Sequence, residues 1–235
     1  MSEATDANRQ ARIASCLRAM GIVRYRLRSR QDAGGSSEAE PVPRPAASSP
    51  AEMDWGELEK AVAGCRACKL CESRRNTVFG VGDRSADLMI VGEAPGAEED
   101  RKGEPFVGRA GMLLDNMLAA IGLQRQQVYI ANILKCRPPG NRNPTVEEAA
   151  ACAPYLQRQI ELVAPRLVLA VGGVAAHNLL STDESVGRLR GCAHRLPHGD
   201  REVLVTYHPA YLLRRPEEKA KAWADLQLLA RRLHG

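Results

Sequence analysis

The sequence has 235 residues with 44% hydrophobic and only 4% aromatic content, so a core must rest mainly on Leu, Val, Ile and Ala. No apolar stretch reaches the roughly 18 residues of a membrane span, and the N-terminus lacks the apolar region of a secretory signal. The net charge of +5 is a weak indication of nucleic-acid binding, and we expect a cytoplasmic, bacterial-type intracellular protein.

The first part of the chain differs in composition from the rest. Residues 1–30 combine one amphipathic helical pattern with several arginines. We interpret them as a small helical, basic module, either a partly ordered tail or an arm that contacts DNA or a partner protein. Residues 31–52 are rich in Gly, Ser, Pro and Ala and cannot bury enough surface to offset the entropy of ordering. They predict a flexible linker that precedes a main domain over residues 53–235.

The main domain alternates apolar runs with helical patterns. Continuous apolar runs predict strands buried on both faces at residues 87–91, 128–131, 167–171 and 203–207. Helical patterns occupy residues 110–121, 146–163, 174–180 and 217–233. The alternation predicts an α/β fold, a three-layer α/β/α sandwich around a short, mainly parallel four-stranded sheet. Ligands bind such sheets at the carboxyl ends of the strands, so we expect the functional residues there.

An acidic segment, GEAPGAEED, follows the first predicted strand and begins at Gly92. Its two glycines and Pro95 fix a tight turn and let the main chain approach a ligand. An acidic run of this kind is otherwise a solvated loop. Phe106 lies in the next loop, between Pro105 and Gly108. It is either a core residue or a platform on which a nucleic-acid base stacks.

Polar side chains follow two further strands. Asn132 ends the second strand and either caps a loop or reads a base edge, because its amide donates and accepts side by side. His208 follows the last strand, is held by Pro209, and is a candidate donor to a developing negative charge. The next residues have the composition of an apolar wedge for a base stack, flanked by phosphate contacts. These residues are Tyr211, Leu212, Leu213, Arg214 and Arg215.

Seven cysteines in an intracellular protein do not indicate a disulfide framework, so metal or cluster ligation is the leading alternative. Cys65 and Cys68 form a C-x-x-C pair, and Cys136 and Cys152 follow the second predicted strand. Four thiolates suit either zinc or a 4Fe–4S cluster. The spacing alone does not distinguish the two.

Four segments in order resemble the family 4 uracil-DNA glycosylases, the iron–sulfur branch of that superfamily: GEAPGAEED, GEPFVGRAG, VYIANILKCRPPGNRNP and HPAYLLRRP. The resemblance covers about residues 58–233. It implies a monofunctional glycosylase of base excision repair, which flips uracil out of DNA and hydrolyses its N-glycosidic bond. It also implies one 4Fe–4S cluster as cofactor. The ligands would be Cys65, Cys68, Cys136 and Cys152.

The resemblance implies a role for each pocket residue. The main chain around Glu93 and Ala94 would line the uracil pocket. Phe106 would stack on the base. Asn132 would pair with the O4 and N3–H edge of uracil and reject cytosine, and His208 would hydrogen-bond O2. The loop of residues 211–213 would fill the gap left by the flipped nucleotide.

The first motif departs from that of the family 1 relatives, which carry Gln-Asp-Pro-Tyr where this chain has Glu-Ala-Pro-Gly at residues 93–96. The Asp that assists water attack and the Tyr that excludes thymine are both absent. We therefore expect Glu93 or Glu99 to position the water, with Asp100 as the next candidate. Glu99 is also a candidate barrier to thymine.

The cluster is expected to be structural, although a redox or sensing role stays open. It would tie the N-terminal helix of the domain to the loop after Asn132 and present Lys135, Arg137 and Arg142 to DNA. Cys71 forms a second C-x-x-C with Cys68, but the matching family position is usually not a cysteine. We therefore leave it unliganded, together with Cys16 and Cys192.

Two alternatives remain for the function. The chain is a superfamily member that acts on another deaminated base, such as hypoxanthine or xanthine, or a non-catalytic, cluster-bearing DNA-binding or redox protein. The expected partner is uracil-containing DNA, single- or double-stranded. We expect no membrane partner, a monomer with activity at the nucleoid, and a repair protein as a candidate contact of residues 1–30.

Overall fold

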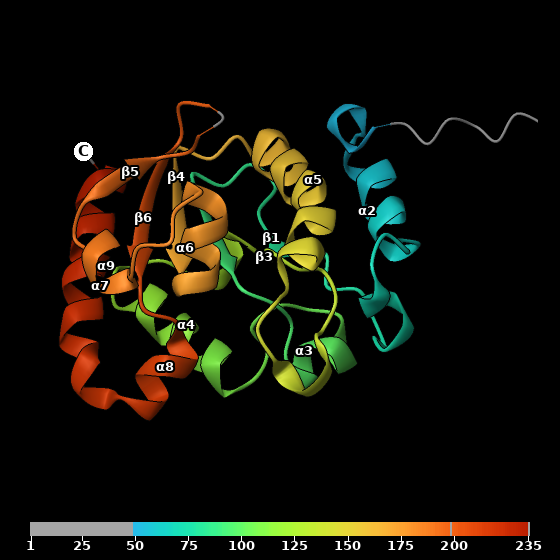
Figure 1. The fold of residues 1–235 in the computed structure, drawn as a ribbon. Coiled ribbons are helices and arrows are strands. Elements are labelled where there is room, and N and C mark those ends of the chain that lie inside the picture. Colours follow the sequence, from blue (N-terminus) through green and yellow to red (C-terminus); the bar gives the residue numbers. More distant parts are fainter. Residues whose placement is uncertain (1–48, 198, 235) are drawn as a thin grey trace, which may run out of the picture. The chain divides into compact units, whose positions relative to one another are not determined.

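The computed structural model describes residues 49–197 and 199–234 (Figure 1). The module predicted for residues 1–30 and most of the predicted linker lie outside these residues. The last residues of the predicted flexible linker are helical. Pro50–Glu52 form a short 3-10 helix, η1, which packs against α5 (Val146–Val163). None of the helices described combines the length and apolar character that crossing a membrane requires.

Within these described residues the sheet has six strands, in the order β1-β3-β2-β4-β6-β5. The strands are β1 (Val81–Gly82), β2 (Leu88–Gly92), β3 (Tyr129–Asn132), β4 (Leu167–Val171), β5 (Ala193–Arg195) and β6 (Glu202–Thr206). The central four, β3, β2, β4 and β6, are parallel and coincide with the four predicted strands. The antiparallel edge strands β1 and β5 were not predicted, because two or three residues are too short to carry a strand pattern.

Helices cover both faces of the sheet and confirm the predicted three-layer α/β/α fold (Figure 1). One face packs against α5, α6 (Gly173–Leu180) and α7 (Val186–Leu189). The other packs against α4 (Arg109–Ala119), α8 (Pro209–Arg214) and α9 (Lys219–His234). Neighbouring residues of a strand point to opposite faces, so Met89 joins the first layer and Ile90 the second. Each fully buried side chain of this kind contributes about 1.5–3 kcal/mol.

The helix α2 (Trp55–Ala63) lies beside α5 (Figure 1). It begins at a capping box, in which the Asp54 carboxylate accepts from the Glu57 N–H at 2.9 Å and the Glu57 carboxylate accepts from the Asp54 N–H at 3.1 Å. Its buried residues Leu58 and Val62 form a separate apolar cluster with Met53. The helix ends just before the first C-x-x-C pair. The short 3-10 helix η2 (Lys69–Glu72) follows that pair.

Two segments interpreted as loops are helical. The acidic segment forms α3 (Ala97–Lys102), which begins after Gly96 and carries its carboxylates in the first turn, where the helix dipole favours negative charge. The segment after the last parallel strand forms α8, which has Pro209 at its first position and His208 as its N-cap. The remaining 3-10 helices are η3 (Arg125–Gln127), η4 (Pro139–Asn141) and η5 (Pro216–Glu218).

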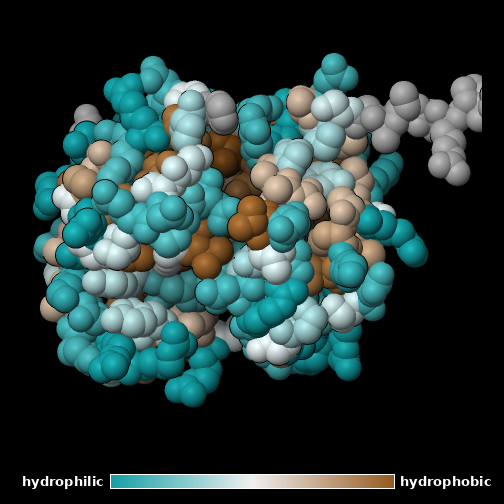
Figure 2. All heavy atoms as spheres, viewed as in Figure 1, coloured by the Kyte–Doolittle hydropathy of each residue, from teal (hydrophilic) through white to brown (hydrophobic). Residues whose placement is uncertain are grey.

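An apolar hollow of about 300 Å³ lies between α5 and α6. Figure 2 shows apolar side chains gathered on this face of the molecule. Its apolar lining is formed by Ile133, Leu156, Ile160, Leu179 and Leu196. The hollow shares no lining residue with the pocket described next.

Candidate active site

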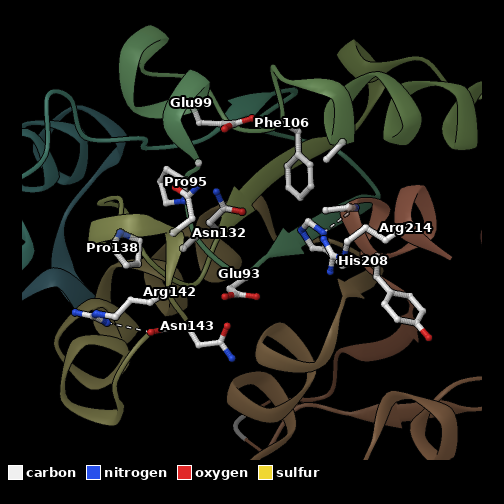
Figure 3. Close-up of a pocket in the computed structure, with 16 residues that line it drawn as sticks. Glu93, Pro95, Glu99, Phe106, Asn132, Pro138, Arg142, Asn143, His208 and Arg214 are labelled. Carbon is white, nitrogen blue, oxygen red and sulfur yellow. Dashed lines mark hydrogen bonds between the residues drawn. The ribbon is translucent and has the colours of Figure 1, made fainter.

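The carboxyl ends of β2, β3 and β6 surround a pocket of about 400 Å³ (Figure 3). Apart from Asp100, it brings together the residues that the sequence analysis named as catalytic or substrate-binding. These are Glu93, Ala94, Glu99, Phe106, Asn132 and His208. Tyr211 and Arg214 of α8 also line the pocket. Residues separated by more than a hundred positions therefore meet at one edge of the parallel sheet.

Asn132 lies at the end of β3 with only 2% of its surface exposed. Its Oδ1 atom has no hydrogen-bond partner among the described residues. A Cβ atom at Gly92 would lie 2.4 Å from this Oδ1 and 2.6 Å from Cζ of Phe106, so only glycine lets both side chains lie against the end of β2. Leaving a buried acceptor unpaired costs about 1–3 kcal/mol. The arrangement indicates a ligand that brings an N–H or O–H donor.

The loop around Phe106 is held in a strained conformation. Phe106 has a positive φ of 54°, which is unfavourable for a bulky residue. A Cβ atom at Gly111 of α4 would lie 1.7 Å from the Phe106 carbonyl oxygen, and Arg125 donates to that oxygen at 3.3 Å and to the Pro105 carbonyl. The ring is largely buried, yet it lines the pocket and stacks on His208 at 5.6 Å. Phe106 thus belongs to both the core and the pocket.

His208 presents one ring nitrogen to the pocket as a donor. Its Nδ1 accepts from the Ala210 N–H at 3.1 Å, so the hydrogen bond assigns the proton of the neutral ring to Nε2. Burial, together with the charge of Arg214, lowers the pKa of His208 to about 4, while Glu99 acts in the opposite direction. The imidazole is therefore a neutral donor at neutral pH.

The two acidic candidates have different environments. Glu99 is engaged, because its Oε1 accepts from the Val107 N–H at 3.0 Å and the Gly108 N–H at 3.1 Å and so ties α3 to the Phe106 loop. Glu93 lines the pocket, and none of the hydrogen bonds within the described residues involves its carboxylate (Figure 3). Burial raises the pKa of Glu93. The two carboxylates therefore differ in their freedom to meet a ligand or a water molecule.

Three expectations from the sequence are corrected by the structure. Asp100 is buried outside the pocket and accepts from main-chain N–H groups of residues 75 and 76, so it is structural. Leu212 was expected to be exposed but is 1% exposed, because consecutive residues of α8 point in different directions and this one faces the core. Leu213 is exposed and Tyr211 is half-buried. Lys135 was expected to face DNA but is 1% exposed, because its ammonium group binds buried acceptors.

Several pocket residues were not predicted from the sequence, although Arg142 among them was expected to face DNA. The loop between β3 and α5 contributes Pro138, Asn141, Arg142 and Asn143 to the lining (Figure 3). Arg142 is oriented by Glu148, which accepts from its two terminal nitrogens at 2.8 and 2.6 Å. The Pro- and Gly-rich stretch after Cys136 is a sequence pattern that could have indicated this loop. No such pattern indicated that Arg125 binds the carbonyl groups of Pro105 and Phe106.

The four predicted ligand cysteines line a second, smaller pocket. They are Cys65, Cys68, Cys136 and Cys152. Arg74 donates to the Cys136 sulfur at 3.1 Å and to the Cys65 carbonyl at 2.8 Å. Burial raises the pKa of Cys136 to about 11 and also raises that of Cys152. The geometry brings four thiols and the cation of Arg74 to one place.

The remaining cysteines lie elsewhere. Cys71 is not part of the lining of this small pocket, Cys192 is exposed beside His194, and Cys16 lies outside the described residues. Within those residues no three or more His, Cys, Asp or Glu side chains come together as closely as a single bound ion requires. Four thiols around one small pocket are the kind of donor set that suits zinc or an iron–sulfur cluster.

Comparison with known proteins agrees with this description. The model of the uracil DNA glycosylase superfamily matches residues 79–227. The chain is 43% identical over 177 residues to the type-4 uracil-DNA glycosylase of Archaeoglobus fulgidus, covering 73% of this chain and 89% of the relative. The corresponding enzyme of Thermotoga maritima is 44% identical over 158 residues, with 67% and 82% covered. The type-5 uracil-DNA glycosylase of Mycobacterium leprae is 35% identical over 184 residues, with 68% and 79% covered.

The α/β/α fold, the pocket at the strand ends and the family match define a member of the uracil-DNA glycosylase superfamily. Within this superfamily the chain belongs to the type-4 family, to which its identity is highest among the relatives named above. The resemblance noted in the sequence is thereby confirmed.

Proposed function

We propose that this protein is a monofunctional uracil-DNA glycosylase of base excision repair. Water adds across the bond between the sugar C1′ and uracil N1, which releases free uracil and leaves an abasic site in the DNA. One observation carries the proposal. The buried Oδ1 of Asn132 lacks a partner among the described residues, beside an aromatic ring and a neutral imidazole donor. Uracil supplies the missing N3–H donor, and membership of the type-4 family supports the same reaction.

Recognition follows from the donor and acceptor pattern of the base. The Asn132 amide accepts from N3–H of the flipped uracil and donates to O4. Cytosine has an acceptor at N3 and a donor at C4, so both contacts would be mismatched. A site built on such paired hydrogen bonds rejects the mismatched analogue strongly. Phe106 stacks on the flipped base, and its loop is already held in place by Arg125 and Gly111.

Cleavage develops positive charge on the sugar and negative charge on the departing uracil. The Nε2–H group of His208 donates to O2 and stabilises the leaving anion, and losing one such donor typically costs about 10²–10³ in rate. Glu93 orients the attacking water and accepts its proton, because its carboxylate lines the pocket and makes no hydrogen bond within the part of the chain that the structure describes. The clamped Glu99 is the barrier against the thymine methyl group, since its position is fixed by two main-chain donors.

The exposed end of α8 binds the DNA around the flipped nucleotide. Leu213 enters the gap that uracil leaves, Tyr211 borders it, and Arg214 and Arg215 contact phosphates. Leu213, Arg214 and Arg215 are exposed, as this contact requires. Arg137 and Arg142 extend the basic surface on the opposite side of the pocket. DNA is the substrate, the protein acts as a monomer at the nucleoid, and residues 1–30 are the candidate contact for a repair protein.

An assay of free uracil released from uracil-containing oligonucleotides tests this function directly. Purified protein is expected to release free uracil from single- and double-stranded oligonucleotides. Asn132→Asp is expected to lower the single-turnover rate on uracil by at least about 100-fold and to improve excision of cytosine, because the carboxylate reverses part of the pattern. Asn178→Asp, on the exposed face of α6, is the matched control. No release of uracil from either DNA would refute the proposal, and release only from hypoxanthine or xanthine DNA would reassign the substrate.

The four cysteines of the small pocket are proposed to hold one 4Fe–4S cluster. When bound, it supplies a covalent tie between the segment after α2, the loop after β3 and helix α5, and it takes no part in hydrolysis. Anaerobically purified protein should show visible iron–sulfur absorption and about four irons per chain. Cys152→Ser should lose most of this iron, whereas Cys71→Ser should keep it. Zinc in place of iron would contradict the assignment.

A further inference from the structure

Lys135 lies between the base pocket and the cysteine pocket. It follows Asn132 by three residues and precedes the expected ligand Cys136. Its side chain is 1% exposed and lines the cysteine pocket. Lysine is almost never fully buried unless its charge is paired, so this position requires an explanation. The hydrolysis described above makes no use of it.

The hydrogen bonds of Lys135 connect two elements. Its Nζ atom donates to the Asn132 carbonyl at 2.9 Å and to Oε1 of Gln159, on α5, at 2.5 Å. The Gln159 amide is fixed in this orientation, because its Nε2 donates to the Phe79 carbonyl at 2.9 Å and to the Tyr129 hydroxyl at 3.1 Å. Lys135 therefore joins the end of β3 to an acceptor that has no freedom to turn away.

The peptide group after Asn132 is held at both of its edges. The N–H group of Ile133 donates to the Gly92 carbonyl at 2.9 Å, and the Asn132 carbonyl accepts from Lys135. The direction of the Asn132 side chain depends on the orientation of this peptide. Its amide must lie within about 0.5 Å of the productive geometry to read a base edge.

Both hydrogen-bond acceptors of Lys135 are neutral, so neither offsets its charge. Lys135 lines the same small pocket as Cys136 and Cys152, two of the expected cluster ligands. Thiolates that bind a metal cluster carry a net negative charge, and a buried cation beside them offsets it. Lys135 thus lies beside the cysteines whose charge it would offset, and it also binds the carbonyl group of Asn132, the residue that reads the base.

We propose that Lys135 is a positioning residue that couples the cysteine pocket to the reading of uracil. Its ammonium group balances the cluster thiolates and, held there, fixes the Asn132 peptide for the contact with uracil. The proposal rests on the function and the cluster proposed above. It predicts that Lys135 affects discrimination between uracil and other bases, in addition to any effect on stability.

The test compares Lys135→Met, which keeps the length of the side chain but removes its charge and donors, with Lys135→Arg, which keeps both. The matched control is Lys69→Met, an exposed lysine beside Cys68. Binding is measured with DNA that carries uncleavable 2′-fluoro-deoxyuridine and with the same DNA carrying cytosine. Iron content, visible absorption and melting temperature are recorded for each protein, and kcat and KM are measured on cleavable DNA.

Lys135→Met is expected to weaken binding to the uracil analogue by about 10–100-fold, with a smaller change for the cytosine DNA, and to reduce the iron content. Lys135→Arg should restore much of both, and Lys69→Met should match the wild type. Unchanged uracil binding in Lys135→Met, or an equal loss on both DNAs, would overturn the proposal. If Lys135→Met does not fold, Lys135→Gln, which retains an N–H donor, is compared in the same way. A wild-type protein that releases no uracil would instead refute the proposed function.

Discussion

Gly92→Ala is expected to reduce single-turnover uracil excision by at least about 100-fold while the protein still folds. The added Cβ atom would lie 2.4 Å from Oδ1 of Asn132 and 2.6 Å from Cζ of Phe106. Both contacts are far inside van der Waals separation, so the reading amide and the stacking ring must both move. Displacing groups that orient a substrate by about 1 Å can cost 10²-fold in rate. One methyl group would therefore affect base recognition and base stacking together.

The control for this variant is Gly56→Ala, at an exposed position of α2 where the nearest atom to an added Cβ is at 3.5 Å. Gly56→Ala should keep full activity, since alanine favours a helix over glycine. Melting temperature and circular dichroism show whether Gly92→Ala has folded. A folded Gly92→Ala protein with activity within a few-fold of the wild type would mean that the positions of Asn132 and Phe106 do not determine excision.

The sequence predicted the parts of the fold that rest on local pattern. The four central strands were found because they are continuous apolar runs, and α5 was found from its helical pattern. In the structure, a capping box of Thr145 and Glu148 begins α5 and Ala164 ends it. Segments whose state depends on their surroundings were missed. The acidic segment forms α3, in which the carboxylates lie in the first turn and interact favourably with the helix dipole. The segment predicted as an apolar wedge, residues 211–213, lies in α8, where Leu212 faces the core.

The pocket was predicted through residue types that face a ligand, and the supports of those residues were not. Asn132, Phe106 and His208 stand at strand ends or in a loop beside one, where their chemistry is visible in the sequence. Arg125 acts on the Phe106 loop from nineteen positions away, and Lys135 acts on Asn132 from the core side. An arginine or lysine is expected at the surface. Only the tertiary structure shows that these cations bind buried carbonyl groups.

The structure also separates two carboxylates that the sequence left equivalent. The Oε1 atom of Glu99 accepts from the N–H groups of Val107 and Gly108, so Glu99 is suited to fix the Phe106 loop and one wall of the pocket. Glu93 lines the same pocket, its carboxylate makes no such bond to residues 49–197 or 199–234, and burial raises its pKa. A raised pKa makes a carboxylate a better proton acceptor near neutral pH. These differences support the proposal that Glu93 positions the water and that Glu99 forms the thymine barrier.

Glu93→Gln is therefore expected to lower the single-turnover rate by about 10²–10⁴-fold with little effect on DNA binding. In the wild type the rate should fall as the pH drops through the raised pKa of Glu93, because protonation removes the base. His208 adds no inflection in its ordinary range, since its pKa is lowered to about 4 and the ring is already neutral above that value. The acid limb of the pH profile should disappear in Glu93→Gln.

Two further variants separate this role from a general effect of charge. Glu98→Gln, an exposed residue paired with Arg101 on the same helix, should retain wild-type activity. Glu99→Gln should change the ratio of uracil to thymine excision and keep the acid limb, because its carboxylate orients the loop without touching the water. If Glu99→Gln abolished the acid limb and Glu93→Gln preserved it, the two roles would be exchanged. The lack of a hydrogen bond from the described residues to a carboxylate would then not identify the general base that activates the water.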